Sequence, residues 1–323
     1  MPTAKGRPVI HSLDDPTGIS GLRGRTLRAM RKRCGSAIVE LKSYARSVFK
    51  QNLIAIETNA TTYVYEYSPQ AQAITDRQIK NIIYRNLLGI GDPLWSVQWW
   101  MNSYLKASFE RGTNDSLRSA KNLSPASVVG VELSQELRST ELEQVLQQPH
   151  YRRRLEYAYG RTFNEMIGFS DVTAKQVSGI LGRAIASGKN YRAVAKEFNK
   201  VFDDMRGYRA LRIVRTEMNK INTDAYMDNT EQLNKNVFSD GDFEVAVMHL
   251  SALAENTRRN HAFRHGKVYS SEEQTEWWDS GSNRINCQCS VTDVLRNKKT
   301  GKVLQTALHK KALEQGREFF GQS

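Results

Sequence analysis

The chain has 323 residues, of which 39% are hydrophobic and 25% charged, with a formal net charge of +13. This length predicts roughly two domains with a sizeable core, and the charge favours nucleic acid, another polyanion or an acidic protein surface as partner. Three cysteines, two of them in a C-x-C pair, make no disulfide framework. The apolar runs fall far short of the roughly 20 residues that span a bilayer, and the N-terminus has no signal-like apolar region. The sequence therefore predicts a protein made in the cytoplasm with reduced thiols.

Residues 1–35 are predicted to form an extended basic arm. Residues 1–21 hold three of the seven prolines. A cluster of six cations with no acidic residue among them follows: Arg23, Arg25, Arg28, Arg31, Lys32 and Arg33. Six like charges in eleven residues repel one another unless something neutralises them. The cluster is either the solvated start of a helix or a contact for phosphate or for an acidic partner.

Residues 36–150 are predicted to be mainly helical and to contact a partner. Apolar residues between Ile38 and Phe49 recur at helix spacing. The alternating tyrosines of 61–68 predict a strand. Asp92 and Pro93 can begin a further helix and Gly112 can end it. Its aromatic load is more typical of a core or an interface than of a ligand site.

Residues 151–235 are predicted to form a helical bundle of amphipathic segments. One segment has Thr173 as its cap and Gly188 as its end, and two more follow it. Residues 236–323 read as a small α+β module with a basic helical tail. Apolar and polar residues that alternate along the chain predict strands near 243–247, 267–269 and 288–294, and a short helix is predicted at 255–265. The predicted fold class is mainly α, with helical N-terminal and central regions and this C-terminal α+β module.

The C-terminal module holds a candidate metal set: His261, His265, Cys287 and Cys289. Two histidines and two cysteines are a legitimate zinc composition, but C-x-C is tighter than the usual ligand spacing, and neighbouring arginines oppose a cation. In the competing interpretation the cysteines pack as small apolar groups and His261 makes core hydrogen bonds. A third interpretation is a metal-dependent nuclease or toxin-like domain that also uses Asn260, Asp279 and Asn283.

A second motif, Arg215-Thr216-Glu217, lies in a predicted helix. Glu217 lies at the edge of the apolar face, where a charge needs a partner. A structural ion pair, with Arg215 or Arg258, is favoured over a catalytic role because no second carboxylate or nucleophile matches it. Phosphate-loop, dinucleotide, zinc-protease and serine-hydrolase motifs are absent. The sequence thus predicts a protein that is not an enzyme and has no catalytic residue and no bound cofactor, with structural zinc as the minority alternative.

Taken in order, these stretches resemble the phage head morphogenesis family, the phage Mu F-like minor head proteins. The first element is the helix from Ala210 to Glu217 with Asn222 and Ala225. The second is Thr257, Arg258 and His261 followed by Gly266, Lys267 and Val268. The last is Asn286-Cys287-Gln288-Cys289. The resemblance gives Arg215, Thr216, Glu217, Arg258, His261 and Gly266 the status of motif residues. Arg284 and Gln288 depart from the usual proline and arginine of the last motif.

The resemblance implies a structural minor head protein of a tailed bacteriophage, in the virion near the portal vertex. It would act in procapsid assembly, DNA packaging or DNA delivery. The implied partner is the portal protein, with the major capsid or scaffolding protein and double-stranded DNA as further candidates and no membrane. A plain DNA-binding protein without enzymatic activity is the other alternative.

Overall fold

The computed structural model describes residues 8–56, 63–89, 99–123 and 131–321. The chain forms two compact units, each assembled from separate stretches. The first unit contains Met1–Arg23, Tyr104–Glu156 and Arg215–Ser323, and the second contains Gly24–Ser103 and Tyr157–Val214. Among the described helices, none combines the length and the apolar character needed to cross a membrane.

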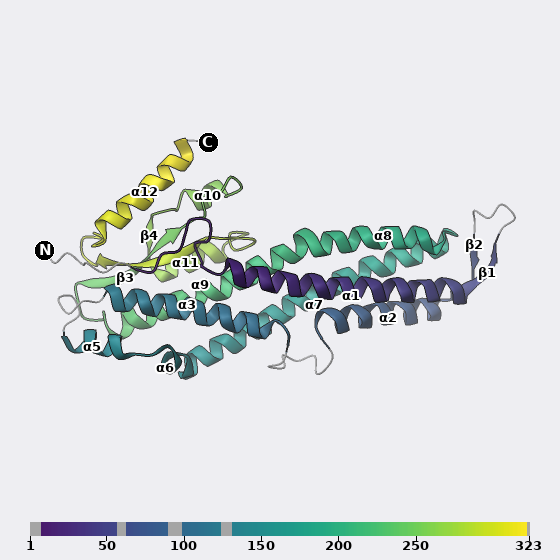
Figure 1. Cartoon of the computed structure of the whole chain (residues 1–323), viewed down its shortest axis with the longest axis horizontal. Helices are drawn as coiled ribbons and strands as arrows, with labels where there is room; N and C mark the ends of the chain where they lie inside the picture. Colours follow the sequence, from purple (N-terminus) through teal and green to yellow (C-terminus); the bar gives the residue numbers. More distant parts are fainter. Residues whose placement is uncertain (1–7, 57–62, 90–98, 124–130, 322–323) are drawn as a thin grey trace. The chain divides into compact units, whose positions relative to one another are not determined.

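Long helices dominate the chain, and the strands are short (Figure 1). The helices are α1 (Ser20–Asn52), α2 (Pro69–Leu87), α3 (Asn102–Leu123), α5 (Val131–Ser139), α6 (Leu142–Gln147), α7 (Pro149–Ala186), α8 (Tyr191–Asp204), the π-helical turn η1 (Met205–Arg209), α9 (Ala210–Asn236), α10 (Arg259–Ala262), α11 (Ser271–Asp279) and α12 (Thr306–Gly321). The strands are β1 (Leu53–Ile56), β2 (Tyr63–Tyr65), β3 (Phe243–Leu250), β4 (Val268–Tyr269) and β5 (Ser290–Asn297). The predicted fold class, mainly α with a small C-terminal α+β module, is confirmed.

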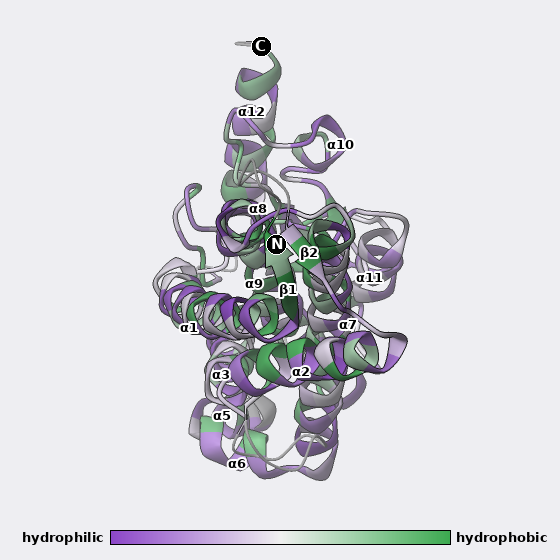
Figure 2. Cartoon of the chain, turned by 90° about the vertical axis from the view of Figure 1, so that its right-hand side faces the viewer, coloured by the Kyte–Doolittle hydropathy of each residue, from purple (hydrophilic) through white to green (hydrophobic). Residues whose placement is uncertain are grey.

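The second unit is helical apart from one hairpin. The helix-period residues Val177, Leu181 and Phe198 are buried, as their spacing predicts. The Asn190 side chain accepts a hydrogen bond from the Ala193 amide at 3.1 Å and so caps α8. Strand β1 pairs antiparallel with β2. All four residues of β1 are exposed although the strand is hydrophobic (Figure 2).

The first unit is built on a three-stranded antiparallel sheet of order β4-β3-β5. Strand β3 is buried on both faces because alternate side chains enter two different apolar clusters. Val247 packs with Tyr226 of α9 and Trp278 of α11. Met248, on the other face, packs in a cluster with Ala312 of α12. The sheet therefore lies between α9 and α11 on one side and α12 on the other.

Helix α1 begins earlier than the predicted arm allows. Extended structure was predicted to residue 35, but the helix starts at Ser20. Asp15 provides the start signal, since its Oδ2 accepts the Ser20 amide hydrogen bond at 2.8 Å. Met30 and Cys34 are both fully buried and anchor the first part of the helix. The basic cluster is therefore helical.

Two predicted helix boundaries lie inside longer helices. Gly112 is in the middle of α3, and the predicted start of that helix at Asp92 and Pro93 lies outside the described residues. Thr173, predicted to be a cap, is interior to α7 and donates from Oγ1 to the Phe169 carbonyl at 2.9 Å. Such a bond to residue i−4 satisfies the hydroxyl without ending a helix. Gly188, at φ +62°, does follow the end of α7.

Candidate functional site

The Arg215-Thr216-Glu217 motif holds the chain just before the C-x-C pair. Thr216 Oγ1 accepts the Asn286 amide hydrogen bond at 2.9 Å, and Arg215 donates to Asn286 Oδ1 at 3.4 Å. Asn286 has φ +54°, a left-handed conformation that asparagine tolerates better than most residues. One helical turn later, Asn219 donates to the Cys287 carbonyl at 2.5 Å. Helix α9 thereby fixes the position from which Cys287 and Cys289 enter the core.

Arg258 holds the same loop from the opposite direction. Its guanidinium donates to the carbonyls of Ser282 and Asn283 at 2.6 Å each, and to that of Ile285 at 3.3 Å. A planar fork of donors suits three carbonyls from one turn, which a single ammonium does not reproduce. Arg258 is therefore a structural residue that shapes the 282–286 turn.

Arg258→Lys is expected to destabilise the chain by about 2 kcal/mol, because charged hydrogen bonds to several carbonyls are lost while the positive charge is kept. Urea unfolding measures the change. Arg259→Lys is the matched control, since Arg259 is exposed and its guanidinium lies 6.0 Å from the centre of the Phe320 ring. Equal losses in the two variants would contradict the proposed role of the fork.

Three of the four predicted metal-binding residues lie together in a buried cluster. His261 Nδ1 lies 3.3 Å from Cys289 Sγ and 3.5 Å from Cys287 Sγ. His261, Cys287 and Cys289 are between 2% and 6% exposed. A cavity of about 60 Å³, lined also by Arg215, Arg258 and Asn286, adjoins them. It is large enough to hold water.

The two thiols ionise unequally. The hydrogen bond between them lowers the pKa of Cys287, and His261 adds to this effect. The same hydrogen bond raises the pKa of Cys289, and burial raises it further. Without another cation, one negative charge is all that this buried pair readily accepts.

His265, the fourth predicted ligand, makes different contacts. Its Nδ1 accepts the Ser251 amide hydrogen bond at 3.0 Å, and its ring packs near Gly316 of α12. The neighbouring Gly266 has φ +78°, and a Cβ there would come within 2.7 Å of the Leu313 nitrogen. Glycine is therefore required at 266 by both conformation and the approach of α12.

His249, which the sequence interpretation missed, joins the cluster in place of His265. One ligand atom each of His249, His261 and Cys289 lies within 4.8 Å of the other two. The signal was present in the alternation of β3, because Val245, Val247 and His249 share one face of the strand. Val247 packs with Cys287 and Cys289, and the next inward position on that face is His249.

Residues 175–292 match the model of the family described as phage Mu protein F like protein. The chain contains a phage Mu F-like domain. This domain includes both motifs and the complete His/Cys cluster, and it confirms the resemblance seen in the sequence. It indicates a bacteriophage head morphogenesis protein, and so a protein of the virion. Comparisons with curated proteins and with solved structures gave no significant match.

The basic cluster of α1, outside the Mu F-like domain, divides into buried and exposed cations. Arg23 is 7% exposed and donates to Asn219 Oδ1 at 2.6 Å and to Asp15 Oδ1 at 3.1 Å. Arg33 is half-buried, and its guanidinium lies 4.9 Å from the centre of the Trp100 ring. The other four remain exposed: Arg25, Arg28, Arg31 and Lys32. Arg23 therefore stabilises the interior of the first unit. A contact with phosphate or an acidic partner remains a hypothesis for the four exposed cations.

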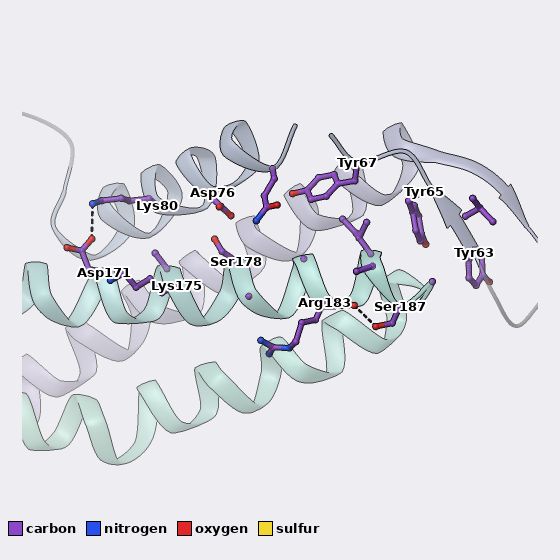
Figure 3. A pocket seen from close by; sticks show the side chains of 18 residues that line it. Tyr63, Tyr65, Tyr67, Asp76, Lys80, Asp171, Lys175, Ser178, Arg183 and Ser187 are labelled. Atoms are coloured by element: carbon purple, nitrogen blue, oxygen red, sulfur yellow. Dashed lines mark hydrogen bonds and ion pairs between the residues drawn. The ribbon is translucent and has the colours of Figure 1, made fainter. Parts of the chain in front are cut away.

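A groove of about 1090 Å³ lies in the second unit between α2, α7 and β2 (Figure 3). Lys80 and Asp171 form an ion pair at 2.9 Å toward one end, and Tyr63, Tyr65 and Tyr67 lie toward the other. The lining includes carboxylates as well as cations. This mixed polarity fits a polypeptide segment better than a polyanion.

Proposed function

We propose that this chain is a structural minor head protein of a tailed bacteriophage that associates with the portal vertex. The observation that carries the proposal is the Mu F-like domain at residues 175–292. The contacts of its motif residues are consistent with a structural role, since Arg215, Thr216 and Arg258 all hold one turn of the first unit. Procapsid assembly, DNA packaging and DNA delivery are the steps at which such a protein would act.

Partner contact is assigned to the second unit. Besides the mixed groove, the hairpin exposes apolar side chains, with Ile54 62% and Ile56 54% exposed. Exposed apolar groups that lie together on a small hairpin favour a protein partner. The exposed cations of α1 add a charged surface suited to DNA phosphates or to acidic side chains. The portal protein is the partner proposed for this unit.

Imaging of assembled phage heads tests the location. Particles that carry a labelled copy of the chain are expected to show the label at one vertex, in few copies, and particles lacking the chain are expected to be defective in assembly or DNA content. A label spread over the whole shell, or no chain in purified particles, would overturn the proposal.

The double variant Arg25→Glu, Arg28→Glu is expected to weaken binding of both the purified portal protein and DNA if these cations make the contacts. For DNA, the slope of log affinity against log salt should fall by about 2, since each lost phosphate contact removes roughly 0.9. Lys196→Glu, Lys200→Glu, on the exposed face of α8, is the control with the same charge change. If portal and DNA binding both matched those of the control, Arg25 and Arg28 would have no contact role.

The alternative of a metal-dependent nuclease requires a reactive group that a DNA backbone can reach. His261 is 2% exposed and faces the two sulfurs. Asn260 donates to Asn283, and Asp279 pairs with Arg284 and Lys220. These contacts favour the structural proposal, and assay of the metal-loaded chain on double-stranded DNA decides between the two.

A further inference from the structure

Four residues with metal-binding side chains converge inside the Mu F-like domain from three parts of the chain. His249 lies near the end of β3, His261 in α10, and Cys287 and Cys289 directly before β5. Each is at most 6% exposed, and the two cysteines pack with Val247 and Trp278 in an apolar cluster. An imidazole in such surroundings loses its contact with water and needs a compensating interaction.

The distances from His261 Nδ1 to the two sulfurs match a small tetrahedral site. Metal–nitrogen bonds of about 2.0 Å and metal–sulfur bonds of about 2.3 Å place nitrogen and sulfur about 3.5 Å apart on a tetrahedron. His261 Nδ1 lies 3.3 Å and 3.5 Å from the two sulfurs, and a ligand atom of His249 lies within 4.8 Å of His261 and Cys289. We propose that His249, His261, Cys287 and Cys289 bind one zinc ion in a closed structural site.

His249 is already oriented for this role. Its Nδ1 lies 3.2 Å from Gln274 Oε1, to which it can donate, and its Nε2 is buried with no hydrogen-bond partner among the described residues. A zinc-binding histidine usually donates its other ring N–H to an oxygen in this way. Gln274 is therefore the outer partner that fixes the ring, and Nε2 is the atom available to the metal.

The surrounding arginines make hydrogen bonds and ring contacts of their own. Arg264 donates to Gln274 Oε1 and lies 3.6 Å from the centre of the Tyr269 ring. Arg258 is bonded to the carbonyls of the 282–286 turn. Two thiolates and one divalent cation together form an electrically neutral group, which suits an apolar site. Two sulfurs and two nitrogens in a tetrahedron favour zinc over harder cations.

The test uses the full-length chain, stripped with a chelator and reloaded with zinc(II) alone. About one zinc per chain is expected, together with protection of Cys287 and Cys289 from alkylation. Cobalt(II) in place of zinc should give sulfur-to-metal charge-transfer bands and the intense visible bands of tetrahedral coordination. Absence of stoichiometric zinc or cobalt after reloading would overturn the proposal, whatever the variants do.

Matched substitutions identify the ligands. His249→Gln is expected to lose stoichiometric zinc, whereas His265→Gln, the same change at a buried histidine outside the cluster, is expected to keep it. Gln274→Ala should weaken zinc binding by 10-fold to 100-fold, as outer partners do. If the His249 variant does not fold, the cobalt spectrum of the unmodified chain still reports sulfur and nitrogen ligation. Zinc retained in His249→Gln and lost in His265→Gln would refute this ligand set.

Discussion

Asp293→Asn is expected to make the chain more stable than the unmodified protein at pH 8, while the two differ little near pH 4. Asp293 lies on β5 and is fully buried. Burial raises the pKa of its carboxyl from 3.8 to about 7, opposed by hydrogen bonds from Thr230, Tyr226 and Ser116. The carboxyl is therefore mostly protonated in the folded chain below neutral pH, and asparagine is its uncharged analogue.

The direction of the pH effect follows from proton binding. Between pH 3.8 and about 7 the folded chain binds a proton at Asp293 that the unfolded chain has released. The free energy of unfolding therefore falls as pH rises through this window, at about 1.4 kcal/mol per pH unit, or roughly 4 kcal/mol in total. Above pH 7 the loss is complete, because both states are then ionised.

Urea unfolding of both proteins at several pH values between 4 and 8 measures this contribution. Buried histidines such as His249 and His265, whose pKa values burial lowers, give stability of the opposite pH dependence. They are common to both proteins and cancel in the difference. The groups that meet the Asp293 carboxyl are hydroxyls of α3 and α9, with Thr230 Oγ1 at 2.8 Å and Ser116 Oγ at 3.4 Å. If the free energy of unfolding changed with pH in the same way for both proteins, the pKa of Asp293 would not be raised by folding.

Local patterns in the sequence predicted the helices and strands well because they depend on spacing. The stripe of Val177 and Leu181 and the alternation of Val245 and Val247 both became buried faces. A missed element, α11, also had a local signal. Ser270 accepts the Glu273 amide bond and Glu273 accepts that of Ser270, which is a capping box legible as S-x-x-E.

Long-range partners could not be read from the sequence in the same way. Arg23 looked like one member of a surface charge cluster, but it is bonded to Asn219, 196 positions away. His265 looked like the natural partner of His261 at helix spacing, but α10 ends at Ala262, and the ring meets the Ser251 amide instead. Which histidine lies beside His261 depends on how the face of β3 packs against the neighbouring helices, and the sequence does not give this packing. The sequence therefore identified three residues of the buried cluster (His261, Cys287 and Cys289), whereas His249 could not be recognised as the fourth.

Gly112→Ala is expected to be among the most damaging single substitutions in the first unit. Gly112 lies in the middle of α3, where a Cβ would come within 2.1 Å of the Asn222 carbonyl oxygen of α9 and 2.9 Å of its carbon. Both atoms belong to the backbone, so no side-chain rotation can relieve the clash. The two helices are locked at this distance by hydrogen bonds from Asn222 to the Ser108 carbonyl, at 3.1 Å, and from Ser108 to the Met218 carbonyl, at 2.8 Å.

The expected cost of Gly112→Ala is about 3 kcal/mol, the upper part of the usual range for overpacking. This is a net value, because alanine in a helix interior would otherwise stabilise by up to about 1 kcal/mol. Gly168→Ala in α7 isolates that intrinsic gain, since nothing lies within 4 Å of the added methyl group there. The free energy of unfolding measured in urea is therefore expected to fall for Gly112→Ala and to rise for Gly168→Ala, although the chemical change is the same. A stabilised Gly112 variant would mean that α3 and α9 are not in contact at this point.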